Sequence, residues 1–214
     1  MTPITFWFDP ISPYAHLAFE HLPQALDGHS VVVDYKPVLF GALLKHHSHK
    51  GPAEIEPKRQ WTFRQVAWLG RSLGIRIDMP AQHPFNPLTL LRLLLAAAGP
   101  SGLPNRHQVE QVFHHVWHGG WDPVAPDRIA ALCSDLGVAN TADLQTNEIR
   151  ERLRALTDEA LAKGIFGVPT FECRGHLLWG LDALPMLRAL LEGDPWFENE
   201  WEAAARPVPG VVRT

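Results

Sequence analysis

The chain of 214 residues has 46% apolar and 20% charged side chains, enough to bury a core, which excludes a disordered or fibrous protein. Its net charge of -4 and pI near 6.3 provide no basic field for a phosphate backbone, so we expect no nucleic-acid partner. The two cysteines, Cys133 and Cys173, cannot supply a disulfide framework, a four-cysteine zinc site or a CxxC redox pair.

The N-terminal segment is predicted to form a strand, a helix and a second strand. Ile4 to Phe8 is a short apolar run with β-branched and aromatic residues, typical of a buried strand and without the basic residues of a leader peptide. Ser12-Pro13 then gives a helix cap followed by proline at the first helical position, and Val31 to Tyr35 is the second strand. This order predicts a βαβ unit with parallel strands. From the start of the chain and its two unpaired cysteines we expect a mature, cytoplasmic protein.

The middle of the chain is predicted to be helical, with no convincing strand between roughly Pro57 and Gly164. Apolar residues recur at helical spacing from Val109 to Trp117 and from Ile129 to Leu136. Weaker or longer patterns cover residues 57–73, 88–98 and 141–163. The most apolar of these, 88–98, is much shorter than the ~20 residues of a membrane-spanning helix, so we expect no membrane partner. We expect a block of five or so helices.

After Gly164 the chain returns to strand chemistry. Val168 to Cys173 and His176 to Trp179 are predicted to pair as a hairpin, and a last helix starts near Asp182 and runs to Gly193. The order βαβ, helices, ββα predicts one α/β domain interrupted by a helical insertion. We expect the domain at residues 1–45 and 165–193, the insertion at 57–164 and a C-terminal tail at 194–214.

Four sequence motifs follow one another along the chain. They are FDPISPY at Phe8–Tyr14, KPVLFGALLK at Lys36–Lys45, GIFGVPTF at Gly164–Phe171 and WGLD at Trp179–Asp182. Together with Pro57-Lys58 and His83–Asn86, they resemble the 2-hydroxychromene-2-carboxylate isomerases and kappa-class glutathione transferases, in the DsbA-like branch of the thioredoxin superfamily. The resemblance implies a thioredoxin-like fold with an inserted all-helical subdomain, serine in place of the redox cysteine, glutathione as cofactor and a homodimer.

Ser12 is the residue that the resemblance marks as catalytic. At a helix start, unpaired backbone N–H groups and the helix dipole favour negative charge, such as a thiolate. If the Ser12 oxygen caps the helix, its hydroxyl proton remains free to donate to the sulfur of glutathione. The dipole contributes about 0.3–1 kcal/mol and the hydrogen bond about 1.5–3 kcal/mol, which lowers the pKa of a thiol. Without the resemblance, Ser12 is only a helix cap.

The same resemblance implies further glutathione-binding residues. A cis bond between Val168 and Pro169 would leave the Val168 backbone to pair with an extended peptide, although only about 5–6% of X-Pro bonds are cis. Leu181 and Asp182 match the position that holds the γ-glutamyl end, where Asp182 is otherwise a plain helix cap.

Two more glutathione contacts are expected, with two departures from the family pattern. Lys58 would neutralise a carboxylate, although a lysine near a helix start is ordinarily solvated. His49 aligns with a family asparagine, and Ala183 stands where the family has arginine. These departures weaken the match in the glutathione subsite.

Other residues are candidates for a substrate wall or a metal site. Those expected to contact an aromatic substrate are Tyr14, Phe40, Trp61, Phe85 and Asn86, although large aromatics are most often core. The histidine-rich loop at 45–50 and the pair His114 and His118 permit a metal interpretation. No cysteine or carboxylate completes the loop set, the histidine pair borders an apolar stripe and the family uses no metal, so we expect none.

The sequence therefore predicts a glutathione-dependent isomerase of aromatic catabolism. It would convert 2-hydroxychromene-2-carboxylate, or a close analogue, to trans-o-hydroxybenzylidenepyruvate by reversible thiolate addition, bond rotation and elimination. Two alternatives stay open: a kappa-like glutathione transferase that releases a stable conjugate, and a non-catalytic thioredoxin-like module that binds glutathione or a peptide. Cys133 and Cys173 are expected to be packing residues, so the reactive sulfur would come from glutathione.

Overall fold

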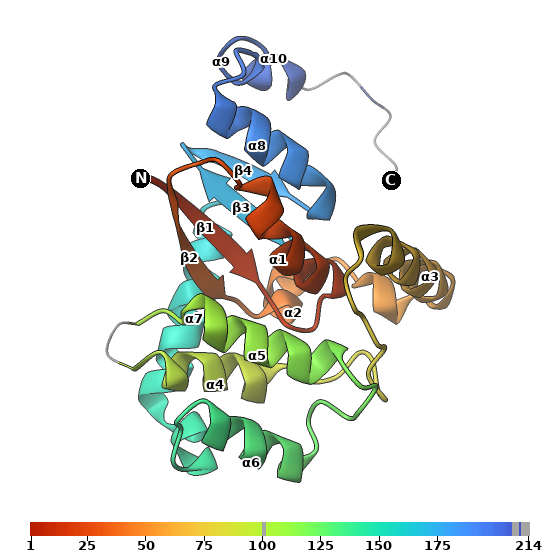
Figure 1. The fold of residues 1–214 in the computed structure, drawn as a ribbon, viewed down its shortest axis with the longest axis vertical. Helices are drawn as coiled ribbons and strands as arrows, with labels where there is room; N and C mark the ends of the chain where they lie inside the picture. The colour runs from red at the N-terminus through yellow and green to blue at the C-terminus, as the bar shows by residue number, and fades with distance from the viewer. Residues whose placement is uncertain (100–101, 207–209, 211–214) are drawn as a thin grey trace.

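A four-stranded mixed sheet with helices on both faces forms the centre of the computed structural model, which describes residues 1–99, 102–206 and 210 (Figure 1). The first elements are β1 (Thr2–Phe8), α1 (Pro13–Ala25), β2 (Val31–Pro37) and α2 (Phe40–His46). A 3-10 turn η1 (Pro52–Glu54), α3 (Glu56–Leu73), α4 (Leu88–Ala97), α5 (Arg106–Trp117), α6 (Pro126–Asp135), η3 (Thr141–Gln145) and α7 (Asn147–Ala162) follow. The chain then forms β3 (Thr170–Cys173), β4 (His176–Trp179), η4 (Leu181–Ala183), α8 (Leu184–Glu192), α9 (Trp196–Asn199) and α10 (Trp201–Ala204).

The sheet has the strand order β2-β1-β3-β4 and confirms the predicted pairing. β1 and β2 run parallel, with Phe6 opposite Tyr35, because α1 provides the crossover between them. β3 is antiparallel to both β1 and β4. The β3–β4 hairpin turns through Arg174 and Gly175, both with positive φ, which matches the right-handed twist of the strands.

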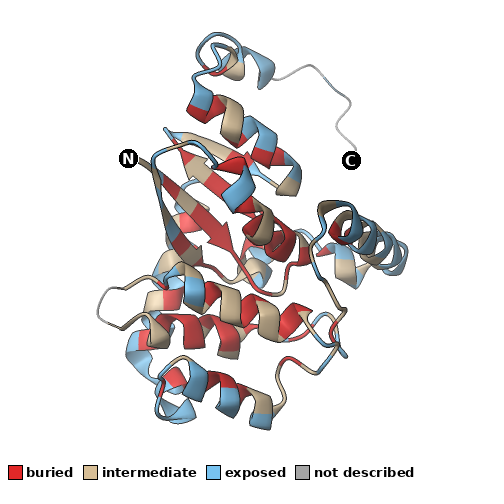
Figure 2. Ribbon diagram, in the orientation of Figure 1, coloured by how far each residue is buried: buried red, intermediate tan, exposed pale blue. Residues whose placement is uncertain are grey.

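Residues of β1 alternate between two apolar layers. Ile4, Phe6 and Phe8 belong to the main core, which also holds side chains of α1, α5 and α8. Trp7 points to the opposite layer, with Leu43 of α2 and side chains of α7. Burial on both faces explains why this strand is an almost continuous apolar run (Figure 2).

The helical middle of the chain is confirmed, with two corrections to element boundaries. The expected helix over 141–163 is two elements, because Asn140 caps η3 with its side chain and Thr146 has an extended backbone at ψ 150°. The helix expected near Asp182 is α8, which begins at Leu184 after the turn η4, but it is not the last helix, because α9 and α10 follow it. Within the described ranges, the segment from 57 to 164 contains no strand.

The division into a domain at 1–45 with 165–193 and an insertion at 57–164 stays a prediction. The main core holds side chains from both parts, for example Phe171 of β3 and Phe113 of α5. Part of the expected tail is folded, since Phe197 is buried and its ring stacks on Trp201, while residues 207–209 and 211–214 lie outside the described chain. Among all the residues that the structure describes, no helix has the length and apolar character needed to cross a membrane.

Candidate functional site

Ser12 lies at the start of α1, directly after the loop that leaves β1. Its Oγ accepts a hydrogen bond from the Ala15 N–H at 3.2 Å, and Pro13 occupies the first turn, so the predicted helix cap is confirmed. The hydroxyl proton is not free as expected, because it donates to the Val168 carbonyl oxygen at 3.4 Å. A bond of this length is weak, so a better acceptor can replace it.

The turn before β3 faces this serine. The Val168-Pro169 bond is cis, as the family resemblance implies. Val168 is only 6% exposed, and its backbone N–H makes no hydrogen bond to another described residue. The Pro169 carbonyl accepts the Gly180 N–H at 2.9 Å, which ties the turn to the end of β4. Ser12 therefore lies against a fixed turn that carries an unpaired donor.

A buried carboxylate holds the loop between β1 and α1. Asp9 is fully buried and accepts the N–H groups of Ile11 at 3.0 Å and Phe40 at 2.9 Å. Burial raises the pKa of Asp9 to about 7, against the opposing effect of these two hydrogen bonds. Asp9 thus joins the Ser12 loop to the first residue of α2, which is where the candidate Phe40 lies.

Two aromatic side chains from the helical block also hold this loop. The Trp117 indole N–H donates to the Pro10 carbonyl at 2.9 Å, and His83 Nε2 lies 2.9 Å from the Ile11 carbonyl. Since a carbonyl can only accept, Nε2 carries the proton of His83, whose pKa burial lowers. Sequence reasoning missed both roles: His83 lies in a motif of the family, but Trp117 is an ordinary member of an apolar stripe.

Tyr14, two residues after Ser12, lies near Asp182. The Tyr14 hydroxyl donates to Gln65 Oε1 of α3 at 2.7 Å, and burial together with the nearby Asp182 charge raises the pKa of Tyr14. Asp182 is exposed, and its carboxylate folds over Gly180, where a Cβ would collide with it. The N–H groups of Leu181 and Asp182 have no acceptor among the described residues, so the start of η4 offers two donors.

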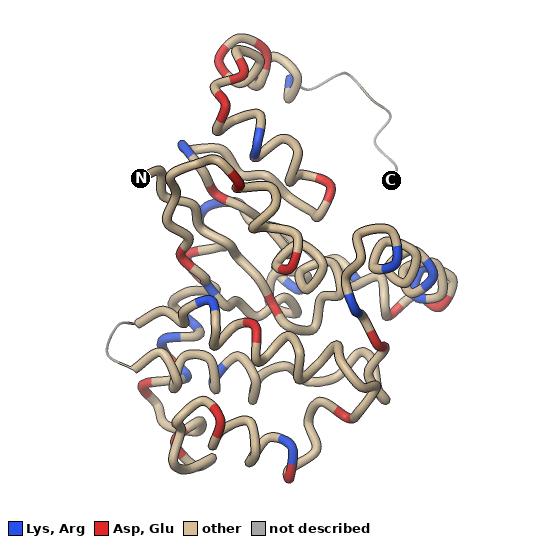
Figure 3. Tube along the Cα trace, viewed as in Figure 1, with Lys and Arg blue, Asp and Glu red and all other residues tan. Residues whose placement is uncertain are grey.

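His49 and Lys58 are exposed and stand apart from these contacts. Neither side chain has a hydrogen-bond or ion-pair partner among the residues the structure describes. Lys58 does share α3 with several cations, beside the N-terminal half of α1 (Figure 3). The basic residues of this helix are Lys58, Arg59, Arg64 and Arg71, against one acid, Glu56.

The other substrate-wall candidates have different environments. Trp61 is 62% exposed on α3. Phe85 is buried in the main core, so it offers no open face, and packing rather than substrate contact explains it. The Asn86 side chain accepts the Leu88 N–H at 3.1 Å and so helps to begin α4.

An exposed aromatic pair flanks the cis-proline turn, and sequence reasoning gave it no role. The Phe166 and Trp179 rings lie 4.9 Å apart, and the side chains are 49% and 55% exposed. The Trp179 indole covers Gly167, where a Cβ would strike it. Both aromatics belong to the motifs quoted above, but the sequence does not show that they are exposed together.

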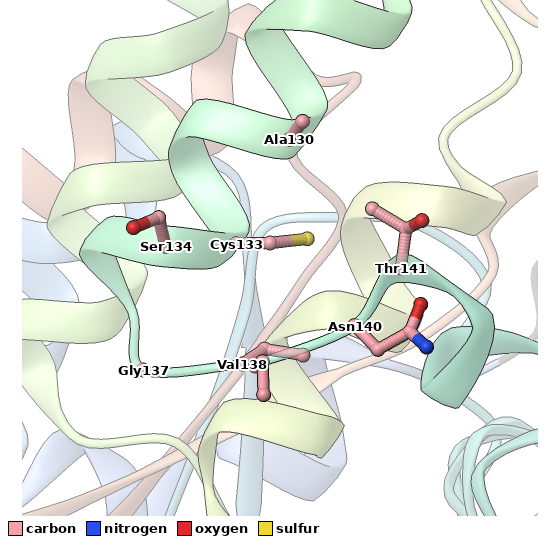
Figure 4. A pocket seen from close by; sticks show the side chains of 8 residues that line it. Ala130, Cys133, Ser134, Gly137, Val138, Asn140 and Thr141 are labelled. Atoms are coloured by element: carbon pink, nitrogen blue, oxygen red, sulfur yellow. The ribbon is translucent and has the colours of Figure 1, made fainter.

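A separate cavity of about 430 Å³ lies at the end of α6 and contains none of the residues around Ser12 (Figure 4). Cys133, Asn140 and Thr141 are among its lining residues. Cys133 and Cys173 are both buried and unpaired, which confirms them as packing residues. Burial raises the pKa of both thiols, so neither supplies a thiolate near neutral pH.

The chain was compared with known proteins. The family model of the DSBA-like thioredoxin domain matches residues 3–192. Glutathione S-transferase kappa 2 of Caenorhabditis elegans is 26% identical over 208 residues, covering 88% of this chain and 91% of that protein. A 2-hydroxychromene-2-carboxylate isomerase of Pseudomonas putida is 26% identical over 197 residues, covering 88% and 93%. A solved 2-hydroxychromene-2-carboxylate isomerase has a TM-score of 0.78 at 20% identity, over 96% of this chain and 100% of that one. The predicted resemblance and fold are confirmed.

Proposed function

The chain belongs to the DSBA-like thioredoxin domain family, and from that premise we propose that it is a glutathione-dependent isomerase of 2-hydroxychromene-2-carboxylate or a close aromatic analogue. Relatives named as isomerases and as glutathione transferases support an enzyme. The observation that carries the proposal is the Ser12 hydroxyl, at a helix start, against the turn where the Val168 N–H is unpaired.

The residues around Ser12 fit glutathione, a peptide with two carboxylates. The unpaired Val168 N–H suits the carbonyl of an extended peptide, as in strand addition. The N–H groups at Leu181 and Asp182 suit a carboxylate, and the Asp182 side chain suits an ammonium. The cations of α3, including Lys58, favour a ligand of negative net charge.

When bound, glutathione supplies a thiolate whose reversible addition to an electrophilic carbon lets a former double bond rotate. The part of Ser12 is to turn its hydroxyl from the Val168 carbonyl to the sulfur, exchanging a 3.4 Å bond for a charge-assisted one. The start of α1 adds its dipole, worth about 0.3–1 kcal/mol. Asp9 and Trp117 fix the loop, so the Ser12 oxygen is positioned before any ligand arrives.

We place the aromatic part of the substrate against Phe166 and Trp179. Their exposed rings flank the cis-proline turn and offer a stacking surface close to Val168. Tyr14 and Trp61 remain candidates from α1 and α3, whereas buried Phe85 does not.

The test is to mix the protein with glutathione and 2-hydroxychromene-2-carboxylate and to follow ring opening by absorbance, with a reaction lacking glutathione as control. We expect turnover only with glutathione. Ser12→Ala should lower kcat/KM about 10–100-fold, since it removes a hydrogen bond to a charged group worth about 1.5–3 kcal/mol. Ser72→Ala is the matched control, because that hydroxyl bonds only to the Leu69 carbonyl near the end of α3. Unchanged turnover in Ser12→Ala would refute the role of Ser12.

A kappa-like glutathione transferase is the second candidate, favoured by relatives of that name at similar identity. Product analysis separates the two: recovery of free glutathione supports the isomerase, and a stable thioether supports the transferase. Because His49 and Ala183 depart from the family pattern, a non-catalytic module that binds glutathione or a peptide is a third candidate. Glutathione binding without acceleration of any thiol addition would support that module.

We also propose that the protein acts in the cytoplasm as a homodimer in aromatic catabolism, as its family likeness implies. Light scattering of the purified chain tests the dimer, and cell fractionation tests the compartment. A monomer at micromolar concentration would contradict the proposed homodimer.

A further inference from the structure

A second group of chemically active side chains lies between α1 and α5. Glu20 is on α1, and Glu110 and His114 are one turn apart on α5, so they share a face of that helix. His114 Nε2 lies 2.8 Å from Glu20 Oε1, and one donor atom from each of the three residues lies within 4.8 Å of the others. We propose that Glu20, Glu110 and His114 bind a divalent transition-metal ion of the Zn²⁺ type.

The spacing of the three donor atoms suits such an ion. Nitrogen and oxygen donors lie about 2.0–2.2 Å from zinc in a tetrahedral site, so two donors on one ion are about 3.4 Å apart. The Glu20–His114 pair, at 2.8 Å, is slightly closer than this, and Glu110 is within reach. All three side chains are half-buried, and the two helices that carry them pack against each other.

The donor chemistry and charge also favour this class of ion. Two carboxylates offset the +2 charge, and an imidazole nitrogen favours zinc and its neighbours over calcium or magnesium. Of the nearby cations, Arg106 acts on Glu20 through its charge, and both Arg106 and Arg76 have a further partner. Arg106 lies over the Phe19 ring at 4.1 Å, and Arg76 pairs with Asp78 at 2.8 Å.

A cavity of about 460 Å³ opens beside two of the three ligands, Glu20 and His114. Glu20, His114 and His118 help to line it, together with the segment 73–76 that follows α3. The His118 ring stacks on His114 at 4.1 Å and lies next to the site. Three protein ligands beside an open space are typical of a metal site whose fourth position takes water or an added ligand.

Further contacts connect this group to the proposed active site. Buried His16 lies between them on α1, with its ring 6.3 Å from His114 and 6.4 Å from Trp117. Its Nδ1 has no hydrogen-bond partner in the described chain. Trp117 in turn holds the Ser12 loop. A bound ion would join α1 to α5 behind that loop.

The proposal departs from the expectation of no metal. In the sequence, His114 and His118 are visible as a pair, but Glu20 is 90 positions before Glu110. Only the packing of α1 against α5 brings the carboxylate of one helix to the imidazole of the other.

The test uses the untagged full chain, stripped with a chelator and titrated with Zn²⁺ by calorimetry, and with Co²⁺ by visible absorption. We expect one ion per chain and a rise in Tm with added Zn²⁺, because an ion that binds only the folded state stabilises it. Glu110→Gln and His114→Gln should each weaken binding at least 10-fold. Glu110→Gln is the cleaner variant, because it removes a ligand while the Glu20–His114 bond remains.

Two controls keep the outcome unambiguous. His107→Gln changes an exposed histidine of the same helix and should leave binding intact. Replacing the three histidines of the 45–50 loop with glutamine should also leave it intact. The proposal is overturned if no 1:1 complex forms, if Glu110→Gln and His114→Gln bind as tightly as the parent chain, or if the loop variant loses the ion. None of these readouts requires glutathione, so failure here is separate from failure of the proposed function.

Discussion

Asp9 combines complete burial, an ionisable side chain and a position three residues before Ser12. The N–H groups of Ile11 and Phe40 donate to the Asp9 side chain and hold the loop in either protonation state, but burial disfavours the negatively charged carboxylate. The pKa of Asp9 is about 7 in the folded chain, against 3.8 as the ordinary value. The folded state therefore binds this proton more tightly than the unfolded chain does, and protonation favours folding.

The free energy of unfolding should depend on pH through Asp9. Its stabilising contribution is complete below about pH 4, decreases as the pH rises toward 7, and is lost above that. At about 1.4 kcal/mol per pKa unit, the total change is roughly 4 kcal/mol. Urea titrations from pH 4 to 8 measure this against Asp9→Asn, which does not titrate, and Asp34→Asn, an exposed control. Parallel pH profiles for the parent chain and Asp9→Asn would contradict the assignment.

Trp179 gives a second prediction for a single residue. Its ring stacks with Phe166 over Gly167 and is 55% exposed, so its removal costs little stability. If this pair holds the aromatic substrate, Trp179→Ala should raise KM for that substrate about 5–10-fold, since aromatic pairs contribute about 0.5–1.5 kcal/mol. The KM for glutathione should stay the same. Trp121→Ala, another exposed tryptophan, is the control, and equal effects of the two would show that Trp179 has no special role.

Among the helices, α5 has two separate connections to the N-terminal segment, one to the loop before α1 and one to α1 itself. Trp117, its last residue, is fully buried and donates to the Pro10 carbonyl of the Ser12 loop. Three residues earlier, His114 pairs with Glu20 of α1. The helical block therefore helps to position the Ser12 loop, although Ser12 and Val168 both lie next to strands of the sheet and outside the helical block.

Replacing Trp117 with phenylalanine should separate the effect of its hydrogen bond to Pro10 from the effect of its packing. Trp117→Phe keeps an aromatic ring but leaves the Pro10 carbonyl unpaired, which costs about 1–3 kcal/mol. Urea denaturation should show that loss, and kcat for glutathione-dependent turnover should fall because Ser12 is less firmly held. Trp121→Phe, at an exposed position, should change neither quantity. If Trp117→Phe is less stable but has a normal kcat, Trp117 contributes to stability only and does not help to position Ser12.

Local signals predicted the elements whose chemistry is contained in a few neighbouring residues. The apolar run of β1, the Ser12-Pro13 cap and the β3–β4 hairpin each depend on adjacent side chains. The 3-10 turn η4 was missed because glycine adopts positive and negative φ about equally readily, so the sequence does not show that Gly180 turns the chain at φ 103°.

Contacts between distant segments were not predictable from spacing. The bond from His83 to the Ile11 carbonyl spans 72 positions, and the bond from Trp117 to the Pro10 carbonyl spans 107. The same limit applies to Phe85, whose aromatic ring suits either a substrate wall or a core, since only the folded chain shows it buried. Ser12 and Val168 were both expected at the glutathione site because the family motifs, not periodicity, connected those two positions.

Across the whole molecule, one main core joins the sheet to the helices between 57 and 164. Phe6 and Phe171 of the sheet belong to the same buried cluster as Leu94 of α4 and Phe113 of α5. Buried residues accordingly continue from the sheet into the helices below it (Figure 2). A smaller cluster, Leu91 and Leu95 with Ile149 and Leu153, lies within the helices alone. Because the larger core is shared between the insertion and its host, the two parts should unfold together.

A cavity in the helical block should therefore weaken the sheet. Leu94 is fully buried, and Leu94→Ala should cost about 2–5 kcal/mol. Far-UV circular dichroism and tryptophan fluorescence should give one shared urea midpoint, lower than that of the parent chain, and the β1 amides should exchange hydrogen faster although they lie in another element. Met186→Ala, at a 37% exposed side chain of α8, should change stability by less than about 0.5 kcal/mol. Two separate transitions, or β1 amides protected as before, would mean that the helical insertion unfolds on its own and that the boundaries at 57 and 164 divide two independent units.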